Sequence, residues 1–221
     1  MATSTAAFIR ANTRLLRPPL VPEIVLHMAE ESLPIWSKTE EQLGEINLAP
    51  PFWAFAWAGG QALARYVLDN PGLVVGKSVL DIGSGSGLVA IAAKMAGAEH
   101  VTANDIDAFA VEACRLNAEA NGTAIDVSAD DLIGAAATAG AEPGADVIFL
   151  ADVFYEKDMA GQVLGYAGRA RRTGSRVLVG DPRRSYFPEN QFKRLADYAV
   201  PVTRELEDNE IKNTAVWEFS G

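Results

Sequence analysis

The sequence predicts an α/β protein in which a mostly parallel β-sheet carries helices on both of its faces. Short apolar runs typical of buried strands alternate along the chain with helical patterns, and strands that alternate with helices form parallel sheets. A glycine-rich loop, residues 83–87, joins the first of these runs to the next helix, as in nucleoside-binding folds. The expected parallel strands are residues 78–83, 100–105, 124–129, 146–152 and 176–181.

The elements around this sheet follow from periodicity and from proline and glycine. The patterns predict helices at residues 58–69, 88–96, 108–121, roughly 132–139, and 159–172. Near the C-terminus, two strand-like runs at residues 199–206 and 214–219 flank a polar loop, which predicts a hairpin added to the sheet. Prolines break residues 1–50 into short helices, and Pro50-Pro51 ends that region. We therefore expect an N-terminal helical extension over residues 1–50 and one domain over residues 51–221.

Composition narrows the range of functions. The chain has 221 residues, 49% of them hydrophobic, which suits one globular domain. A net charge of −10 opposes binding to nucleic acid or to an anionic membrane, and no apolar run approaches the length of a membrane span. The single cysteine, Cys114, excludes an internal disulfide and suits a reducing compartment. His27 and His100 show no metal-ligand spacing.

The first 19 residues carry three arginines and no acidic residue. This composition is found both in mitochondrial transit peptides and in ordinary amphipathic helices. Phe8, Ala11 and Leu15 follow helical spacing, which favours a helix of the mature protein. The expected compartment is a bacterial cytoplasm, or the mitochondrial matrix for a eukaryotic chain.

The glycine-rich loop predicts a nucleoside ligand that has no phosphate. The dinucleotide fingerprint needs a third glycine at position 88, where this chain has Leu88. Asp81 precedes Gly83, Gly85 and Gly87, and its carboxylate suits an amino group and a cationic centre better than a pyrophosphate. S-adenosylmethionine has both groups, so we expect it to be the cofactor.

The ends of the next two strands support this assignment. Asp105 stands 24 residues after Asp81, where a carboxylate can accept hydrogen bonds from both ribose hydroxyls. Ile106 could pack on the adenine, and Asp107 suits the N-cap of the following helix. Asp130 has two interpretations, as an acceptor for the adenine amino group or as a second N-cap.

These segments resemble the seven-β-strand S-adenosylmethionine-dependent methyltransferases. VLDIGSGSG is similar to their first motif and NDID to their second. The resemblance implies a Rossmann-like seven-stranded sheet with the strand order 3-2-1-4-5-7-6. Over most of the chain, PFWAFAWAGGQ, DVFYEKD and VLVGDPRR are similar to the electron transfer flavoprotein β-subunit lysine methyltransferases. That family implies S-adenosylmethionine as methyl donor and the flavoprotein β subunit as the favoured protein substrate; another protein or a small molecule is the alternative.

The same resemblance assigns further site residues. Asp152-Val153-Phe154-Tyr155 matches the D-x-x-Y/F motif that follows the fourth strand of related protein lysine methyltransferases. Asp152 is then expected to recruit and orient the acceptor amine, with Phe154 and Tyr155 as aromatic walls. The competing interpretation is that both aromatics only cap the core.

The segment FWAFAW also has two interpretations. In one, which the resemblance implies, Trp57 lines the cofactor pocket and Gln61 forms a hydrogen bond nearby; in the other, the aromatics pack in the core. Asp181 suits either the acceptor channel or the rim of the sheet. The chain departs from the family pattern at Ala58, where the family has proline, and at Arg183-Arg184, where it has Gly-Arg.

Overall fold

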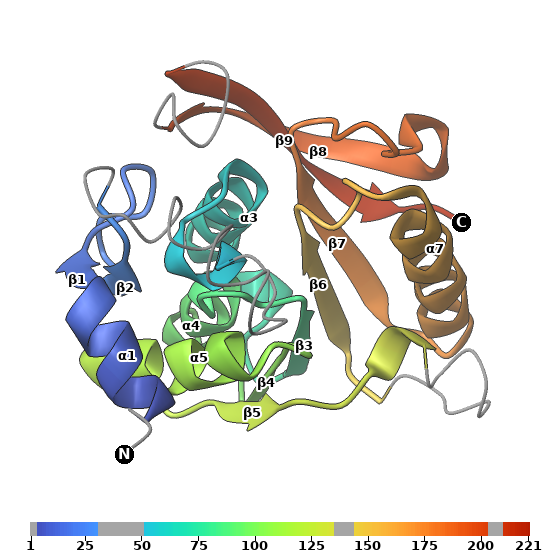
Figure 1. Ribbon diagram of the computed structural model, residues 1–221. Helices are drawn as coiled ribbons and strands as arrows, with labels where there is room; N and C mark the ends of the chain where they lie inside the picture. The colour runs from blue at the N-terminus through green and yellow to red at the C-terminus, as the bar shows by residue number, and fades with distance from the viewer. Residues whose placement is uncertain (1–3, 31–50, 135–143, 203–209) are drawn as a thin grey trace.

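The computed structural model describes residues 4–30, 51–134, 144–202 and 210–221, and its centre is a seven-stranded sheet (Figure 1). Its strands lie in the order β5-β4-β3-β6-β7-β9-β8, with β9 antiparallel to both of its neighbours and the other pairs parallel. Numbered along the chain, this is the order 3-2-1-4-5-7-6, so the predicted topology is confirmed. The strands are β3 Ser78–Ile82, β4 His100–Asn104, β5 Asp126–Ser128, β6 Val147–Ala151, β7 Arg176–Asp181, β8 Phe192–Pro201 and β9 Ile211–Phe219.

The helices cover both faces of the sheet, as predicted. α3 (Ala58–Asp69), α4 (Leu88–Met95) and α5 (Ala108–Ala120) lie on one side, and α7 (Lys157–Arg172) lies on the other (Figure 1). Each matches a predicted helix within about two residues. The helix expected near residues 132–139 falls mostly outside the described residues. The described residues also include three short 3-10 helices: η1 Phe52–Ala54, η2 Pro71–Leu73 and η3 Glu189–Gln191.

The core has two layers because strand side chains alternate between faces. In β6, Val147 and Phe149 pack with α3 and α4, whereas Ile148 and Leu150 pack with α7. All four side chains are fully buried. Burying each contributes about 1.5–3 kcal/mol relative to an exposed position, so this central strand anchors both layers.

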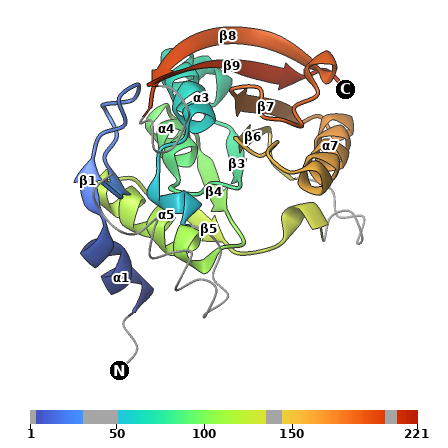
Figure 2. The same ribbon diagram turned by 45° about the horizontal axis from the view of Figure 1, so that its top comes forward.

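The C-terminal hairpin is longer than predicted. β8 begins at Phe192 rather than near residue 199, and β9 begins at Ile211, inside the expected loop. β8 is an edge strand whose exposed side carries Lys193, Arg194 and Asp197, and these charges hide its strand pattern. The hairpin curves over α3 in the tilted view (Figure 2).

The N-terminal segment is only partly helical, so the prediction of a helical extension is wrong for residues 14–28. Ser4 caps α1 (Thr5–Asn12), and the chain then forms a two-stranded antiparallel sheet of β1 (Arg14–Leu16) and β2 (Leu26–Met28). The carboxamides of Asn117 on α5 and of Asn121, the C-cap residue of α5, accept hydrogen bonds from the backbone amides of His27 and Val25, respectively. These tertiary bonds favour extended backbone over local helical periodicity.

The boundary predicted at residue 50 stays a prediction, because residues 31–50 are outside the described part. Val21, Ile24 and Leu26 belong to the same buried cluster as α3 and α4, so the described N-terminal segment packs into the domain core. No helix in the described ranges is long and apolar enough to cross a bilayer.

Candidate active site

A pocket of about 570 Å³ opens at the carboxyl ends of β3, β4 and β6. In α/β sheets, ligands bind at this edge, near the point where the strand order reverses, which here lies between β3 and β6. Eight predicted site residues line the pocket: Trp57, Asp81, Gly83, Gly85, Asp105, Ile106, Asp152 and Tyr155. The structure therefore brings together residues that span about half of the chain.

The glycine-rich loop turns sharply from β3 into α4. Gly83, Gly85 and Gly87 have positive φ values of 66°, 53° and 78°, which side chains with a Cβ adopt only with strain. Gly83 and Gly85 face the pocket, and the Gly85 amide donates to Asp105 Oδ2 at 2.9 Å. Gly87 does not line the pocket, contrary to its predicted cofactor role. It is the N-cap residue of α4, and a Cβ there would lie 3.1 Å from the Cys114 sulfur.

Asp81 is a buried carboxylate in the wall of the pocket. It is 1% exposed, and its Oδ2 accepts a hydrogen bond from the Ala90 amide at 3.1 Å. Burial raises the pKa of Asp81 to about 8. A buried acid of this kind is stabilised in its charged form by a cationic partner, which fits the ammonium of an amino-acid ligand.

The end of β4 offers a second acidic contact. Asp105 accepts from the Gly85 and Asp107 amides, which leaves further lone pairs on the same carboxylate for ligand hydroxyls. Ile106 beside it is 71% exposed, as expected for a side chain that covers a flat ring. Asp107 caps α5 by accepting from the Phe109 amide, which confirms its predicted role.

The structure corrects the assignment at the end of β5. Asp130 does not line the pocket; its exposed carboxylate accepts a hydrogen bond from the Ser128 hydroxyl. The next residue, Asp131, lines the pocket and also accepts from the Gly134 amide. Adjacent acids on an irregular segment point in directions that sequence spacing does not fix.

The aromatic segment before α3 serves packing and the pocket together. Trp53 and Phe55 are buried against α5 and also reach the pocket wall, while Trp57 is half-buried and lines the same pocket. Gln61 does not reach the pocket, which contradicts its predicted cofactor contact. Its side chain is 2% exposed and bonds to the Ala56 carbonyl and the Leu20 amide.

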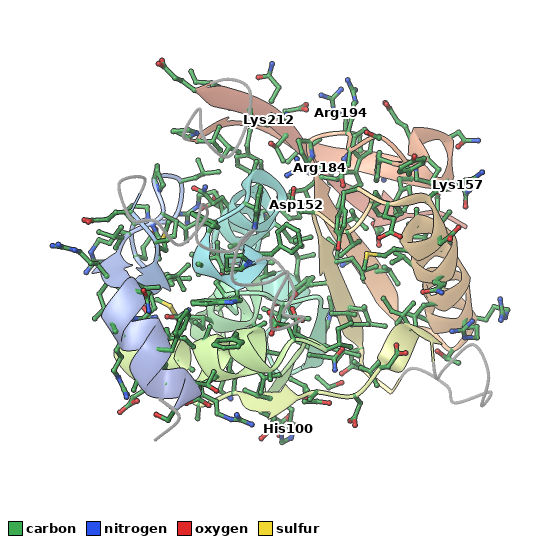
Figure 3. The ribbon with its side chains drawn as sticks, in the orientation of Figure 1. His100, Asp152, Lys157, Arg184, Arg194 and Lys212 are labelled. Carbon is green, nitrogen blue, oxygen red and sulfur yellow. The ribbon has the colours of Figure 1, made fainter. Side chains whose placement is uncertain are left out.

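Asp152 lies at the end of β6 in a left-handed conformation with φ of 56°. Its Oδ1 accepts from Arg184 Nε at 3.1 Å and Nη2 at 2.7 Å, and its Oδ2 accepts from the Gly60 amide at 3.0 Å. Figure 3 shows Asp152 and Arg184 adjacent to each other. A non-glycine residue held in this conformation is a candidate functional position.

A close contact between two glycines brings α3 to this carboxylate. A Cβ on Gly59 would lie 2.2 Å from the Gly180 carbonyl oxygen, and one on Gly180 would lie 2.1 Å from the Gly59 oxygen. The helix start therefore approaches β7 closely enough for Gly60 to reach Asp152.

The two aromatics after Asp152 take different roles. Tyr155 lies on the pocket wall, 46% exposed, with its ring centroid 5.9 Å from that of Phe52. Partial burial raises the pKa of Tyr155. Phe154 is fully buried against Phe187 and Phe192, so its predicted place in the acceptor wall is wrong and the packing interpretation holds.

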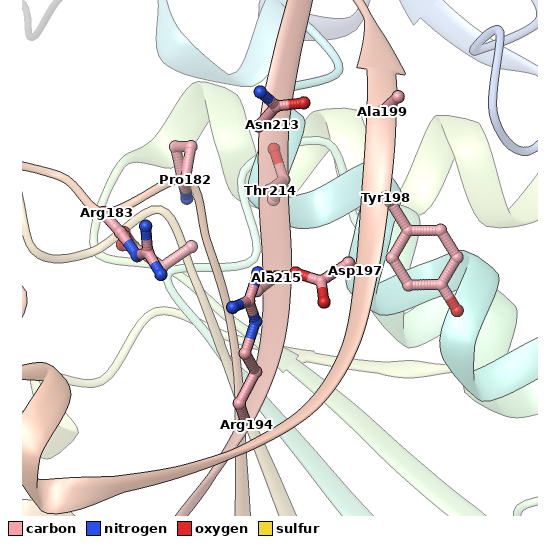
Figure 4. Close-up of a pocket in the computed structure, with 10 residues that line it drawn as sticks. Pro182, Arg183, Arg194, Asp197, Tyr198, Ala199, Asn213, Thr214 and Ala215 are labelled. Carbon is pink, nitrogen blue, oxygen red and sulfur yellow. Dashed lines mark hydrogen bonds and ion pairs between the residues drawn. The ribbon is translucent and has the colours of Figure 1, made fainter.

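A second hollow of about 600 Å³ lies between the turn after β7 and the β8–β9 hairpin (Figure 4). The two guanidinium groups on its wall are paired, Arg183 with Glu189 and Arg194 with Asp197. Asp181 lies between this hollow and Asp152, fully buried, and burial raises its pKa to about 7. The aromatic pocket is the better candidate for chemistry, because it lies at the carboxyl ends of the parallel strands, where α/β sheets bind their ligands.

Among the pocket residues that the sequence analysis did not assign to the site are Phe52, Asp131 and Arg184. Arg184 carried a signal, since Arg183-Arg184 was singled out as a departure from the family pattern. Among the described residues, no group of three or more His, Cys, Asp or Glu side chains could hold a metal ion.

Comparison with known proteins gives relatives over nearly the whole chain. The electron transfer flavoprotein beta subunit lysine methyltransferase of Xenopus laevis is 39% identical over 99% of this chain and 88% of its own length. The Homo sapiens protein of the same name is 34% identical over 96% of this chain and 81% of its length. The family model for ribosomal protein L11 methyltransferase (PrmA) matches residues 61–154.

Solved structures share the fold at low identity. One is Thermoplasma acidophilum 1320, with a TM-score of 0.54 and 22% identity over 72% of this chain and 88% of that chain. Another is magnesium protoporphyrin IX methyltransferase from Synechocystis with bound SAM, with a TM-score of 0.51 and 16% identity over 72% and 76%.

Proposed function

The chain belongs to the family of electron transfer flavoprotein beta subunit lysine methyltransferases, and from this premise we propose that it methylates lysine side chains of a protein. The proposed methyl donor is S-adenosylmethionine, and the favoured substrate is the β subunit of electron transfer flavoprotein. Family membership rests on identities of 32–39% over at least 90% of this chain. Support for the reaction comes from the pocket.

The pocket residues fit the proposed cofactor. Asp81 would hold the ammonium of its amino-acid part, Asp105 the ribose hydroxyls, and Ile106 one face of the adenine. Among the described residues that line the pocket, the single cation is Arg184, which pairs with Asp152; a glycine loop lined in this way suits a nucleoside that carries no phosphate. When bound, the cofactor supplies an electrophilic methyl group on a positively charged sulfur.

The acceptor half must deliver a neutral amine in line with that methyl group. A lysine with a pKa near 10.4 is neutral in about 1 molecule in 2,500 at pH 7, a penalty of about 4.6 kcal/mol. Phe52, Trp57 and Tyr155 desolvate an entering amine, and their faces attract its cationic form by about 0.5–2 kcal/mol each.

Asp152 is the observation that carries this proposal. It lines the same pocket as Asp81 and Tyr155, and its carboxylate is held by the Gly60 amide and by Arg184. A fixed carboxylate in that position recruits and orients the substrate side chain. Orientation of the nucleophile can contribute several kcal/mol to the rate, and the displacement needs no covalent enzyme intermediate.

The test is a methyl-transfer assay with labelled S-adenosylmethionine and purified electron transfer flavoprotein. We expect label on lysines of the β subunit, identified by mass spectrometry. Asp152→Asn keeps the size of the side chain and should lower the rate by about 100-fold or more, because the amine loses the carboxylate that orients it. Asp158→Asn, at an exposed carboxylate on α7, is the matched control and should methylate like the wild type.

Two outcomes would contradict the proposal. Label in a different protein, in a small molecule or in nucleic acid would refute the substrate assignment. Equal rates in Asp152→Asn and the wild type would refute the role of this carboxylate.

We extend the proposal to the compartment. The thiol of the single Cys114 is buried, and burial raises its pKa to about 12. A chain with a single cysteine cannot form an internal disulfide, which fits a reducing compartment such as a bacterial cytoplasm or the mitochondrial matrix.

A further inference from the structure

Arg184 is paired with the carboxylate that the proposed function assigns to the acceptor amine. Two of its nitrogens donate to the same oxygen of Asp152, and its guanidinium carbon lies 5.6 Å from the centroid of the Trp57 ring. Its side chain is 18% exposed and that of Asp152 is 10% exposed, so the pair is largely shielded from water. A cation thus already lies against the acid and the aromatic face that a lysine would meet.

The ion pair matters because Asp152 alone works against the reaction. A carboxylate within about 4–6 Å of an amine stabilises the ammonium and raises its pKa, whereas methyl transfer needs the neutral amine. The aromatic walls oppose this effect only by desolvation. A guanidinium paired with the carboxylate offsets its negative charge, so the carboxylate no longer raises the pKa of the amine. The remaining lone pairs of the carboxylate oxygens can still orient the amine.

Arg184 is the one cation among the described pocket residues that can offset the charge of Asp152. The described residues that line the pocket include five acids and a single cation; the acids are Asp81, Asp105, Asp107, Asp131 and Asp152, and the cation is Arg184. Of the other groups near the acceptor half, Asp181 lies on β7, and Tyr155 and Glu156 lie in the turn after β6. α3 contributes the uncharged Gly60 amide, and α7 contributes Met159 and Gln162.

The backbone fixes Arg184 in this position. Its amide donates to Asp181 Oδ1 at 2.6 Å, and the preceding Arg183 has a φ of 64°. In this turn, the side chains of the two neighbouring arginines lie in different hollows of the protein. Arg183 pairs with Glu189 and lies over the Trp217 ring, whereas Arg184 enters the pocket.

We propose, on the basis of the proposed function, that Arg184 is a positioning residue that stays paired with Asp152 during turnover, so that the acceptor lysine binds as the neutral amine. The lysine loses its proton to solvent as it enters. Its lone pair then forms the new nitrogen–carbon bond while the sulfur–carbon bond breaks and its electrons remain on sulfur. Arg184 takes no part in bond exchange and acts through the charge of Asp152.

The test is the dependence of kcat on pH, which reports ionisations in the enzyme–substrate complex. In Arg184→Gln the carboxylate is no longer offset, so the apparent pKa of kcat should rise by about 1 unit or more above that of the wild type. Arg184→Lys restores the charge and should return the profile toward the wild type. Arg183→Gln is the matched control and should leave the profile in place.

Two results would overturn the inference. If Arg184→Gln lowers KM and leaves the apparent pKa of kcat unchanged, Arg184 only occupies the site and is displaced by substrate. If KM and the pKa are both unchanged in a folded variant, the ion pair has a structural role alone. If the glutamine variant does not fold, Arg184→Met, which keeps an unbranched aliphatic side chain without the charge, can be compared with the wild type for the same two quantities, KM and the apparent pKa of kcat. Failure of the wild type to label the β subunit would instead refute the proposed function.

Discussion

The close contact between Gly59 and Gly180 predicts that alanine substitutions at the adjacent residues Gly59 and Gly60 have opposite effects on stability. Gly59→Ala places a methyl group 2.2 Å from the Gly180 carbonyl oxygen and 2.5 Å from Asp152 Oδ2. Gly60→Ala adds the same methyl group one residue later, where nothing lies within 4 Å. The two variants have the same composition and lie in the same helix, so they differ only in the space that the new methyl group meets.

The magnitudes follow from the two environments. At Gly59 the methyl group meets backbone, so the helix and β7 must separate, and such overpacking costs about 1–3 kcal/mol. For a chain of this size, that lowers Tm by about 2–12 °C. At Gly60 the alanine relieves the conformational entropy of glycine within a helix and should stabilise the fold by about 0.5–1 kcal/mol.

The assay is thermal and urea unfolding of both variants and the wild type, followed by circular dichroism. We expect Gly59→Ala to unfold below the wild type and Gly60→Ala at or slightly above it. Gly59→Ala should also methylate more slowly, because its methyl group displaces Asp152. Equal stability of the two variants would refute the argument that a backbone contact sets the position of α3.

Three further predictions concern titration and burial. Because folding raises the pKa of Asp81, this residue contributes most to the free energy of unfolding below pH 4, and the contribution is lost as pH rises toward about 8. Asp81→Asn should therefore flatten the pH dependence of the free energy of unfolding in this range, and a slope equal to that of the wild type would contradict the argument. Phe154→Ala should lower stability by about 3–5 kcal/mol, whereas Tyr155→Ala should slow methylation with a change in stability of about 1 kcal/mol or less; the reverse pattern in unfolding and activity assays would restore Phe154 to the acceptor wall. Native Cys114 should resist alkylation at pH 8 and react once urea unfolds the chain, because burial raises the pKa of its thiol to about 12; rapid labelling of the folded protein, read by mass spectrometry, would show that the thiol is accessible.

The fold and the cofactor half of the site were predictable because their signals are local. Alternating strand and helix patterns fixed the parallel strands, and the ends of β3 and β4 placed Asp81 and Asp105 at one edge of the sheet. The strand order came from the family resemblance, since periodicity alone does not order strands. Asp107 was recognisable as an N-cap because capping is decided within one helical turn.

The errors share a physical cause, which is tertiary contact. Gln61 and Phe154 stand beside true pocket residues but point into the core, and sequence adjacency does not report that direction. β2 is extended because α5 side chains bond to its flank. Arg183-Arg184 was noticed in the sequence, but the place of Arg184 in the pocket depends on its contact with Asp152, which is 32 residues away.

The two halves of the pocket also differ in the length of chain that must close to build them. Asp105 reaches Gly85 across 20 residues, within one strand–helix–strand unit, whereas Asp152 reaches Gly60 across 92 residues. Closing the longer loop costs more chain entropy and depends on β7 docking against α3. The contact between Asp105 and Gly85 therefore closes within its own unit, whereas the acceptor carboxylate becomes fixed only once β7 has joined the sheet and contacts both Asp152 and α3.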